Sequence, residues 1–306
     1  MSTLNDRKTI VYAGVLLAMV FWSFSFIWYK DVYLYLQPFT TIFTRLVVSS
    51  ALLFLFSWWF KKLQRIKSED YKLILLLAFF EPFLYFIGES LGMQIMTPTA
   101  AAVIIAIVPL LVPIAAFFIL HEKLSAKNIA GIVISFFGVL LVILNKDFEI
   151  RTSLLGVLLM LLAVTGAVFY SVLLKKLTDK YNPFTLITWQ NTIGAVLFLP
   201  LVLIFDVKDW NMAMLSPKAA IPVLELAVFA SSMAFLLYTN GVRKLGAVRA
   251  NIFTNLIPVM TASFSFWLLH ERLVFHNIVG IVVVIGGLVL SQLDSINTYR
   301  NKMFKS

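Results

Sequence analysis

Residues 121–144 read HEKLSAKNIAGIVISFFGVLLVIL, and residues 270–293 read HERLVFHNIVGIVVVIGGLVLSQL. The two stretches align without a gap at an offset of 149 residues, with identical residues at 11 of the 24 positions. Pro109 and Pro258 align at the same offset, and so do Gly92 and Gly241. Self-similarity at one fixed offset indicates that the chain contains two copies of one structural unit.

The composition indicates that this unit lies in a bilayer. Of the 306 residues, 61% are hydrophobic and 13% are charged, and the mean hydropathy is +0.93. Soluble domains have roughly half apolar and about a quarter charged residues. The net charge of +10 comes from short Lys and Arg clusters between apolar runs, which differs from the basic face of a nucleic-acid-binding protein. We therefore expect an all-α integral membrane protein with its function inside the membrane.

Charged or proline-marked breaks divide the sequence into ten apolar runs, each near the ~20 residues that a helix needs to cross the hydrocarbon core. The ten predicted transmembrane helices are residues 10–30, 38–60, 71–92, 97–120, 127–145, 153–175, 184–205, 218–241, 247–269 and 275–294. With the N-terminus inside, 18 Lys and Arg residues fall in cytoplasmic segments and 6 on the other side. Because short basic loops stay cytoplasmic, we expect a multi-pass inner (plasma) membrane protein with both termini cytoplasmic.

Each copy of the repeat contains five predicted helices, and an odd number makes the second copy enter the membrane from the opposite side. The chain is therefore expected to form two inverted five-helix repeats, residues 1–146 and 147–306. Inverted repeats are typical of secondary transporters, in which two similar halves give alternating access to a site near the midplane. A duplication that builds only a scaffold, as in some channels, is the alternative.

Several motifs resemble those of a known family. The string WSFSFIWYK at 22–30 combines a Trp with small polar residues and a closing Lys, and Pro38 and Arg45 follow in the second span. An Ala-rich span with a central Pro, a Glu-containing loop and a Gly-rich span then occur twice, at 97–143 and 246–290. In these motifs the chain resembles the EamA-type branch of the drug/metabolite transporter superfamily over essentially its whole length.

This resemblance implies a ten-helix inverted-repeat carrier whose relatives move amino acids, purines and nucleosides, aromatic metabolites or drugs, mostly outward in bacteria. It does not imply one substrate. The sequence departs from the commonest family pattern at Glu81 and Glu89 in the third span, and at Asn240, Asn251 and Asn255 in the second repeat. We expect these departures to carry the specificity of this chain.

Ionisable residues inside a membrane each cost at least about 2.5 kcal/mol on insertion scales, so they are candidates for function. Four stand out: Arg45, Glu81, Glu89 and Glu225. Glu81 lies nine residues beyond Lys72, about 13 Å along a helix and thus near the midplane. Arg45 reaches a similar depth and can pair with either glutamate of the third span. Such a pair would either hold helices together or belong to the transport path. For Glu225 both substrate contact and helix packing remain as alternatives.

A polar and aromatic set within the spans is expected to line a central cavity, because flat rings hold apolar bodies and amides fix their orientation. The set comprises Trp22, Ser23, Ser25, Tyr85, Tyr170, Trp189, Gln190, Asn191, Tyr238, Asn240, Asn251 and Asn255. Aromatic residues near span ends are more often interface anchors. On that ground the set leaves out Trp28, Tyr29, Trp58, Trp59 and Tyr71.

Glycine and proline positions predict packing and bending. Gly131 and Gly138 align with Gly280 and Gly287, and their spacing of seven places both glycines of each helix on one face. Such a face permits close helix contact, either within the scaffold of each half or at a homodimer surface. The aligned prolines of the fourth and ninth spans are expected to kink those helices.

The sequence contains no recognisable motif for a zinc site, a phosphate-binding loop or a catalytic nucleophile. The HEKL and HERL motifs lack the second His that an HExxH zinc site requires, and no GxxxxGK[ST] loop is present. The chain contains no Cys, and no nucleophile and base have a recognisable spacing. The sequence therefore predicts no enzyme, metal, cofactor or nucleic-acid partner.

The sequence thus favours a secondary transporter that exports small amphipathic metabolites such as amino acids, purine-like or aromatic compounds. Protons are the coupling ion that an intramembrane carboxyl group would allow, since it can be neutral when buried and charged when it faces water. A lipid or lipid-conjugate flippase of the same superfamily is the alternative, because 28 Phe residues could coat an apolar path.

Overall fold

The structure is a computed structural model that describes residues 2–120, 126–143, 153–210, 214, 216–246, 250, 253–272 and 275–303. Within these ranges every regular element is a helix, as predicted. The first half contains α1 (Ser2–Val32), α2 (Pro38–Trp59), η1 (Ser68–Asp70), α3 (Tyr71–Ala78), η2 (Phe79–Leu84), α4 (Tyr85–Ile95), α5 (Pro98–Ile105), α6 (Val108–Leu120) and α7 (Ala126–Ile143). The second half contains α8 (Leu154–Thr178), α9 (Pro183–Leu201), η3 (Val202–Asp206), η4 (Val207–Asp209), α10 (Pro217–Glu225), η6 (Leu226–Ala234), α11 (Phe235–Leu245), η7 (Phe253–Leu256), α13 (Ile257–Leu268) and α14 (Phe275–Met303).

Apolar helical segments follow the ten predicted runs in chain order. Seven are long and apolar enough to cross a membrane: Thr9–Val32, Pro38–Trp59, Ser68–Ile95, Pro98–Ala115, Leu154–Thr178, Pro183–Asp209 and Pro217–Leu245. Three are shorter: Ile129–Val142, Phe253–Leu268 and Phe275–Leu290. The chain is therefore an all-helical, multi-pass membrane protein.

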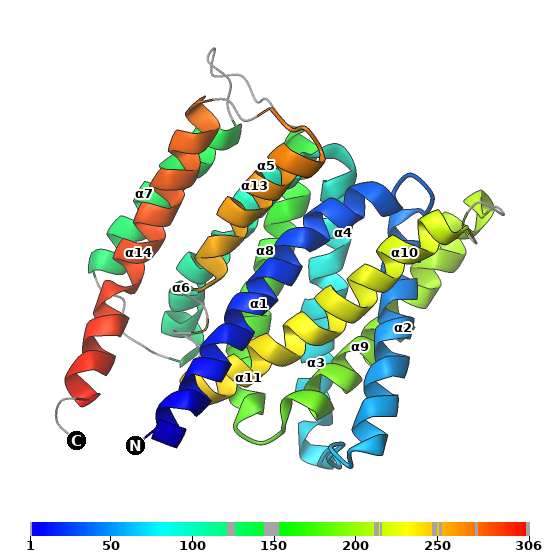
Figure 1. The fold of residues 1–306 in the computed structure, drawn as a ribbon, viewed down its shortest axis with the longest axis horizontal. Coiled ribbons are helices and arrows are strands. Elements are labelled where there is room, and N and C mark those ends of the chain that lie inside the picture. The colour runs from blue at the N-terminus through cyan, green and yellow to red at the C-terminus, as the bar shows by residue number, and fades with distance from the viewer. Residues whose placement is uncertain are drawn as a thin grey trace.

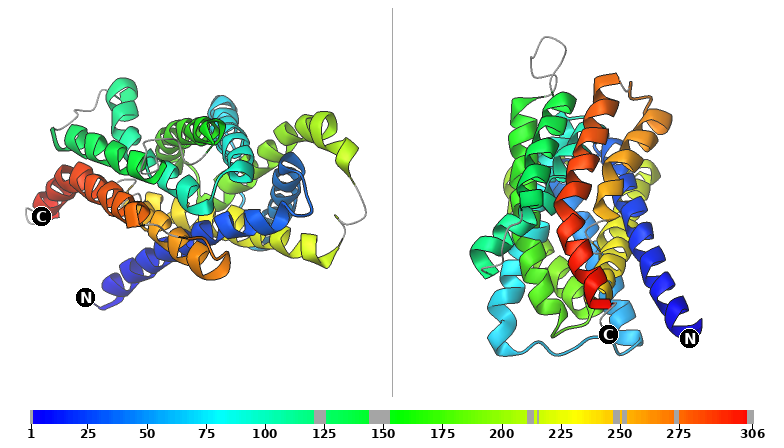
Figure 2. Two further views of the ribbon diagram at one scale, coloured as in Figure 1. Left: turned by 90° about the horizontal axis from the view of Figure 1, so that it is seen from above. Right: turned by 90° about the vertical axis from the view of Figure 1, so that its left-hand side faces the viewer.

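The two halves of the chain are interleaved. Extensive contacts join α7 with α14, α2 with α9, α4 with α8, and α1 with α11 and α13. Each of these pairs combines a helix of the first half with one of the second half. Figures 1 and 2 agree that α7 and α14 lie side by side at one edge of the bundle, and the first turn of α1 and the last turn of α14 lie at the same end.

The α7–α14 contact is made through the aligned glycines. A Cβ atom at Gly280 would lie 2.8 Å from the carbonyl oxygen of Gly138, and one at Gly287 would lie 2.6 Å from that of Gly131. Only glycine allows backbones to approach this closely. The predicted packing role is thus confirmed, but these glycines join the two halves to each other and do not pack within each half.

Pro82 breaks the third span. Proline has no N–H to donate and disfavours helical geometry in the preceding residue, and Glu81 accordingly has φ −148° and ψ 117°. The widened turn η2 needs space beside it, which two glycines provide. A Cβ atom at Gly166 would lie 2.7 Å from the carbonyl oxygen of Phe80, and one at Gly194 would clash with the Pro82 ring.

The fourth span is broken as well. The helix α5 ends at Ile105 and α6 begins at Val108, since Pro109 cannot donate a backbone hydrogen bond to Ile105. The kink predicted for this span is therefore confirmed. Pro258 holds the equivalent position, in the first turn of α13 and directly after the 3-10 turn η7, so the ninth span is also irregular next to its proline.

We predict that Gly166→Ala lowers the thermal denaturation midpoint of the purified protein. The added methyl would press on backbone atoms of η2 and α4, and overpacking of this kind costs about 1–3 kcal/mol. Gly286→Ala is the matched control, because a Cβ atom there meets nothing within 4 Å and alanine favours a helix over glycine. Equal midpoints for the two variants would contradict the close approach at Gly166.

Candidate functional site

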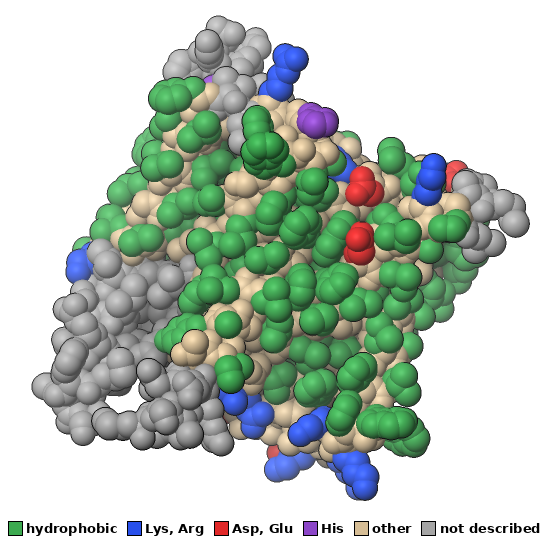
Figure 3. All heavy atoms as spheres, viewed as in Figure 1, with side chains coloured by type: hydrophobic (Ala, Val, Ile, Leu, Met, Phe, Trp, Pro, Cys, Tyr) green, Lys and Arg blue, Asp and Glu red, His purple; other side chains and the backbone are tan. Residues whose placement is uncertain are grey.

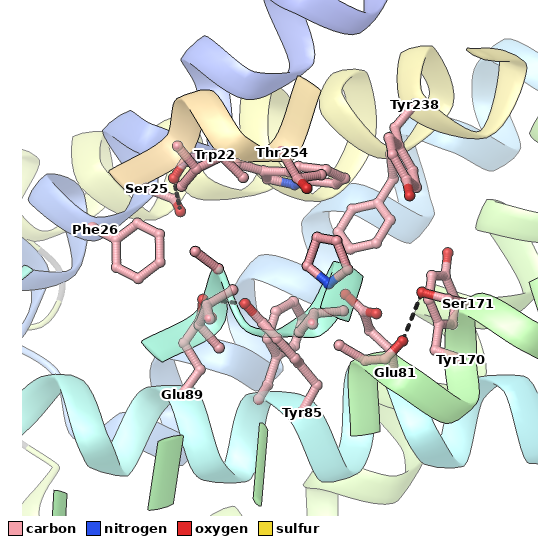
Figure 4. A pocket seen from close by; sticks show the side chains of 18 of the residues that line it. Trp22, Ser25, Phe26, Glu81, Tyr85, Glu89, Tyr170, Ser171, Tyr238 and Thr254 are labelled. Carbon is pink, nitrogen blue, oxygen red and sulfur yellow. Dashed lines mark hydrogen bonds between the residues drawn. The ribbon is translucent and has the colours of Figure 1, made fainter. Parts of the chain in front are cut away.

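A cavity lies at the centre of the bundle, between helices of both halves (Figure 4). Its volume is about 90 Å³, below the ~300–1,000 Å³ of pockets that hold drug-sized ligands, so the cavity must widen to admit a substrate. Its lining combines carboxylates, hydroxyls and aromatic rings with apolar side chains. The lining residues are Trp22, Ser25, Phe26, Arg45, Glu81, Tyr85, Phe86, Glu89, Ile105, Ala106, Val108, Pro109, Ala167, Tyr170, Ser171, Phe235, Tyr238, Thr254 and Ile257.

Glu81 presents an unpaired carboxylate to this cavity. The break at Pro82 places it outside regular helix geometry, and Figure 4 shows its side chain near Tyr170 and Ser171. The residue is 7% exposed, and no hydrogen bond or ion pair joins its carboxylate to another described residue. Burying a charge without a partner is costly, so the carboxylate is available to a proton or to a cationic group.

Glu89 has a very different environment, although it lies only two turns along the chain. Its Oε2 accepts a hydrogen bond from the Tyr29 hydroxyl at 2.8 Å, and its Oε1 accepts one from the Tyr85 hydroxyl at 2.9 Å. The Tyr29 hydroxyl accepts in turn from Nη1 of Arg45 at 2.7 Å. The guanidinium and the carboxylate are therefore connected through one tyrosine oxygen.

Arg45 is 2% exposed and is held by several further groups. Its Nε donates to the Ser231 hydroxyl at 2.7 Å, and its guanidinium carbon lies 4.4 Å from the ring centroid of Phe86. No described carboxylate lies within ion-pair distance of it, so the direct pair expected between Arg45 and Glu81 or Glu89 is not formed. The bridging hydroxyl of Tyr29 occupies the position between the opposite charges.

Aromatic rings form the wall opposite the two glutamates. Trp22 packs against Phe235 and Tyr238, with ring centroids 5.1 Å apart in both pairs. Tyr170 meets Phe235 edge to face at 6.3 Å. Figure 4 shows Glu81, Tyr85 and Glu89 on one side and Trp22 and Thr254 across from them. A carboxylate facing aromatic rings is a suitable environment for an organic cation.

The structure thus brings eight of the predicted site residues to one cavity: Trp22, Ser25, Arg45, Glu81, Tyr85, Glu89, Tyr170 and Tyr238. Three predicted residues of α9 lie elsewhere. Asn191 is buried and donates from Nδ2 to the Ser49 hydroxyl at 2.8 Å and to the Ser231 carbonyl oxygen at 3.0 Å. Trp189 lines a separate groove, since its ring packs edge to face on Phe54. Gln190 is fully buried and adjoins the Tyr170 hydroxyl from behind the cavity wall.

Four further predicted residues of the second half are not among those that line the cavity, and one of them, Asn240, is partly buried on α11. Glu225 is half-exposed on α10, where it faces Asp31 of α1, so the expected contact with substrate is not supported. Asn255 is buried beside the lining residue Thr254, and its Oδ1 has no hydrogen-bond partner among the described residues. Asn251 lies outside the described residues.

Tyr29 is the functional residue that sequence reasoning missed. Its position near a span end suggested an interface anchor, but it is 0% exposed and connects Arg45 to Glu89. The signal was helical spacing: Trp22, Ser25 and Tyr29 follow one another at intervals of three and four residues and therefore share a face.

The HERL motif has a structural contact. Oε2 of Glu271 accepts a hydrogen bond from the Thr99 hydroxyl at 2.8 Å, which ties the start of α5 to the segment after α13. The matching HEKL motif at 121–124 lies outside the described residues.

Comparison with known proteins identifies the family. The model of the EamA-like transporter family matches residues 9–144 and 154–293, which is nearly the whole chain. The chain belongs to the EamA-like transporter family. Its EamA-like relatives include YetK of Bacillus subtilis, described as an uncharacterized transporter, at 28% identity over 80% of this chain and 75% of that protein. An uncharacterized transporter of Archaeoglobus fulgidus is 25% identical over 94% of this chain and 98% of that protein.

The fold of this EamA-like chain also matches a solved crystal structure with a TM-score of 0.70. That match covers 92% of this chain and 98% of the other at 13% identity, so it supports the arrangement of the helices alone. The family and the names of these relatives support a transporter role.

We predict that Tyr29→Phe lowers the thermal denaturation midpoint more than Tyr33→Phe does. Loss of the Tyr29 hydroxyl removes a hydrogen bond from each of two buried charges, Arg45 and Glu89, which costs about 1–3 kcal/mol or more. The Tyr33 hydroxyl donates only to the Ser90 carbonyl oxygen, so its loss should cost about 0.5–1.5 kcal/mol. Equal shifts would contradict the bridging role.

Proposed function

We propose that this protein is a secondary transporter that exports small amphipathic metabolites bearing an amine, such as amino acids, purine-like or aromatic compounds, by alternating access. The observation that carries the proposal is the Glu81 carboxylate, which is buried, faces the cavity and has no partner among the described residues. The membership in the EamA-like family supports the transporter class.

The topology proposed for this transporter is ten transmembrane helices in two inverted repeats, residues 1–146 and 147–306. Both termini would be on the cytoplasmic side of the inner membrane. One pair of π-helical turns supports the repeat, because η2 (Phe79–Leu84) falls within η6 (Leu226–Ala234) at the offset of 149 residues.

Two features of the cavity favour an amine with an apolar body. The Glu81 carboxylate would bind the ammonium, and the rings of Trp22, Tyr170 and Tyr238 would contact the apolar part and add cation–π attraction. Arg45 is joined to Glu89 through the Tyr29 hydroxyl, so these two charges balance each other and Glu81 adds a net negative charge to the cavity. Glu89 has both oxygens occupied.

We further propose protons as the coupling ion. A carboxylate that loses its cationic ligand inside an apolar cavity is unstable as a bare charge, so proton uptake would neutralise Glu81 in the empty carrier. Outward release of the amine and inward passage of a proton could then alternate at one group.

We predict that Glu81→Gln abolishes transport, because the amide keeps the size of the side chain and removes its charge. The measurement is resistance of expressing cells to inhibitory amino acids, purine analogues and aromatic amines, followed by pH-dependent uptake of each hit into proteoliposomes. Glu225→Gln is the matched control, since this glutamate lies outside the cavity, and it should retain wild-type transport.

Unchanged transport and pH dependence in Glu81→Gln would overturn the role of this carboxylate. Transport of neutral analogues as fast as their amines would overturn the substrate class. Lipid scrambling by the purified protein without transport of any metabolite would favour the flippase instead.

A further inference from the structure

We propose that the groove between α3 and α9, next to the loop of residues 60–70, binds an anionic phospholipid. This loop joins α2 to α3, and we call it the basic loop. The groove is lined chiefly by Leu63, Ile66, Ile74, Leu75, Trp189 and Ile193. It shares no lining residue with the central cavity, so the proposal is independent of the transported substrate.

The basic loop begins with a fixed turn. Lys61 has φ 49°, in the left-handed region, and the N–H of Lys62 donates to the carbonyl oxygen of Ser57 at 2.8 Å. This hydrogen bond and the left-handed residue form a Schellman motif, which commonly ends a helix. It directs the chain back across the end of the bundle directly after the exposed rings of Trp58 and Trp59.

Side chains of the second half then hold the backbone of the loop. Nδ2 of Asn182 donates to the Lys62 carbonyl oxygen at 2.7 Å, and the Thr185 hydroxyl accepts from the Gln64 N–H at 2.9 Å. The Tyr181 hydroxyl accepts from the Lys67 N–H at 3.0 Å. These contacts all lie on the side of the α8–α9 connection, while the side chains of residues 61–65 are exposed.

The acidic residues of the loop are already engaged. Oδ1 of Asp70 accepts a hydrogen bond from Nζ of Lys180 at 2.7 Å, and Oδ2 accepts one from the Tyr181 hydroxyl at 2.8 Å. The hydrogen bond to Asp70 raises the pKa of the Lys180 ammonium above its ordinary value. Glu69 lies 3.7 Å from Lys67. The local carboxylates therefore leave other cations of the loop uncompensated.

The uncompensated cations are Lys61, Lys62 and Arg65 of the loop and Lys72 in the first turn of α3, none of which has an ion-pair partner among the described residues. A group of Lys and Arg side chains is visible in Figure 3 at the end of the bundle where α1 begins, below a face covered with apolar side chains. Basic clusters at the end of a membrane helix attract anionic lipid headgroups. Arg65 also lines the groove itself, so cation and apolar surface meet in one site.

Apolar and aromatic groups continue the site into the membrane. Ile74 and Leu75 on α3 face Ile193 on α9 across the groove, which suits an acyl chain. Trp58, Trp59 and Tyr71 are more than half exposed beside it, as expected of rings at the headgroup level. A free phosphate ion would contact only the cations, whereas a phospholipid contacts both parts of the site.

The test is equilibrium binding of fluorescent phosphatidylglycerol, with phosphatidylcholine of the same chains as reference, to the full-length protein in neutral detergent. The wild type should prefer phosphatidylglycerol. The variant Lys61→Gln, Arg65→Gln, Lys72→Gln should lose this affinity by about tenfold or more, given the attraction of each basic residue to anionic lipid. The control Lys176→Gln, Arg243→Gln, Lys244→Gln removes the same charge elsewhere and should bind as the wild type does.

A second pair of variants tests the apolar part without changing charge. Ile193→Trp fills the groove and should weaken lipid binding, whereas Val196→Trp, at a position on α9 that is 65% exposed and outside the groove lining, should not. The proposal would be overturned if a variant and its matched control lost the same amount of lipid affinity. It would also be overturned if the triple charge variant or Ile193→Trp lost no lipid affinity. Displacement of the lipid by glycerol 1-phosphate would also overturn it, since the headgroup alone would then account for binding.

Discussion

The guanidinium of Arg45 is a permanent charge in the middle of an apolar bundle, and the protein itself must take the place of water around it. Tyr29 from α1, Phe86 from α4 and Ser231 from η6 supply that environment. Because each partner comes from a different element, solvating one side chain fixes how α1, α2, α4 and η6 meet. The central cavity is the space that remains beside this contact.

The two glutamates of the third span show how neighbouring residues of one type acquire different roles. Glu89 has both oxygens occupied by tyrosine hydroxyls and belongs to the network around Arg45. Glu81 lies at the helix break, where its own backbone, directly before Pro82, is extended. Its side chain lines the cavity. Because Glu89 belongs to the network and Glu81 has no partner among the described residues, the Glu81 carboxylate is the one left for ligands. Glu225, in the matching span of the second half, lies near Asp31 at the periphery.

Glycines of one half leave space for backbone or proline atoms of the other half. The break at Pro82 is possible because Gly166 on α8 and Gly194 on α9 leave space for it, and the contact of α7 with α14 depends on glycines that align in the repeat. Both the contact at Pro82 and the contact of α7 with α14 join the first half to the second. Movement of the halves against each other, as alternating access requires, would therefore change the lining of the cavity directly.

The sequence by itself determined the helical membrane class, the order of the apolar segments and the family. These follow from composition, periodicity and repeated motifs, which are local properties of the chain. Tertiary structure alone decided that Tyr29 is central, that Trp189 faces a groove, that Glu225 is peripheral and that Arg45 reaches Glu89 through a hydroxyl. An apolar helix in a membrane has little amphipathic pattern to indicate its buried face, so only packing against the other half settles where each polar side chain points.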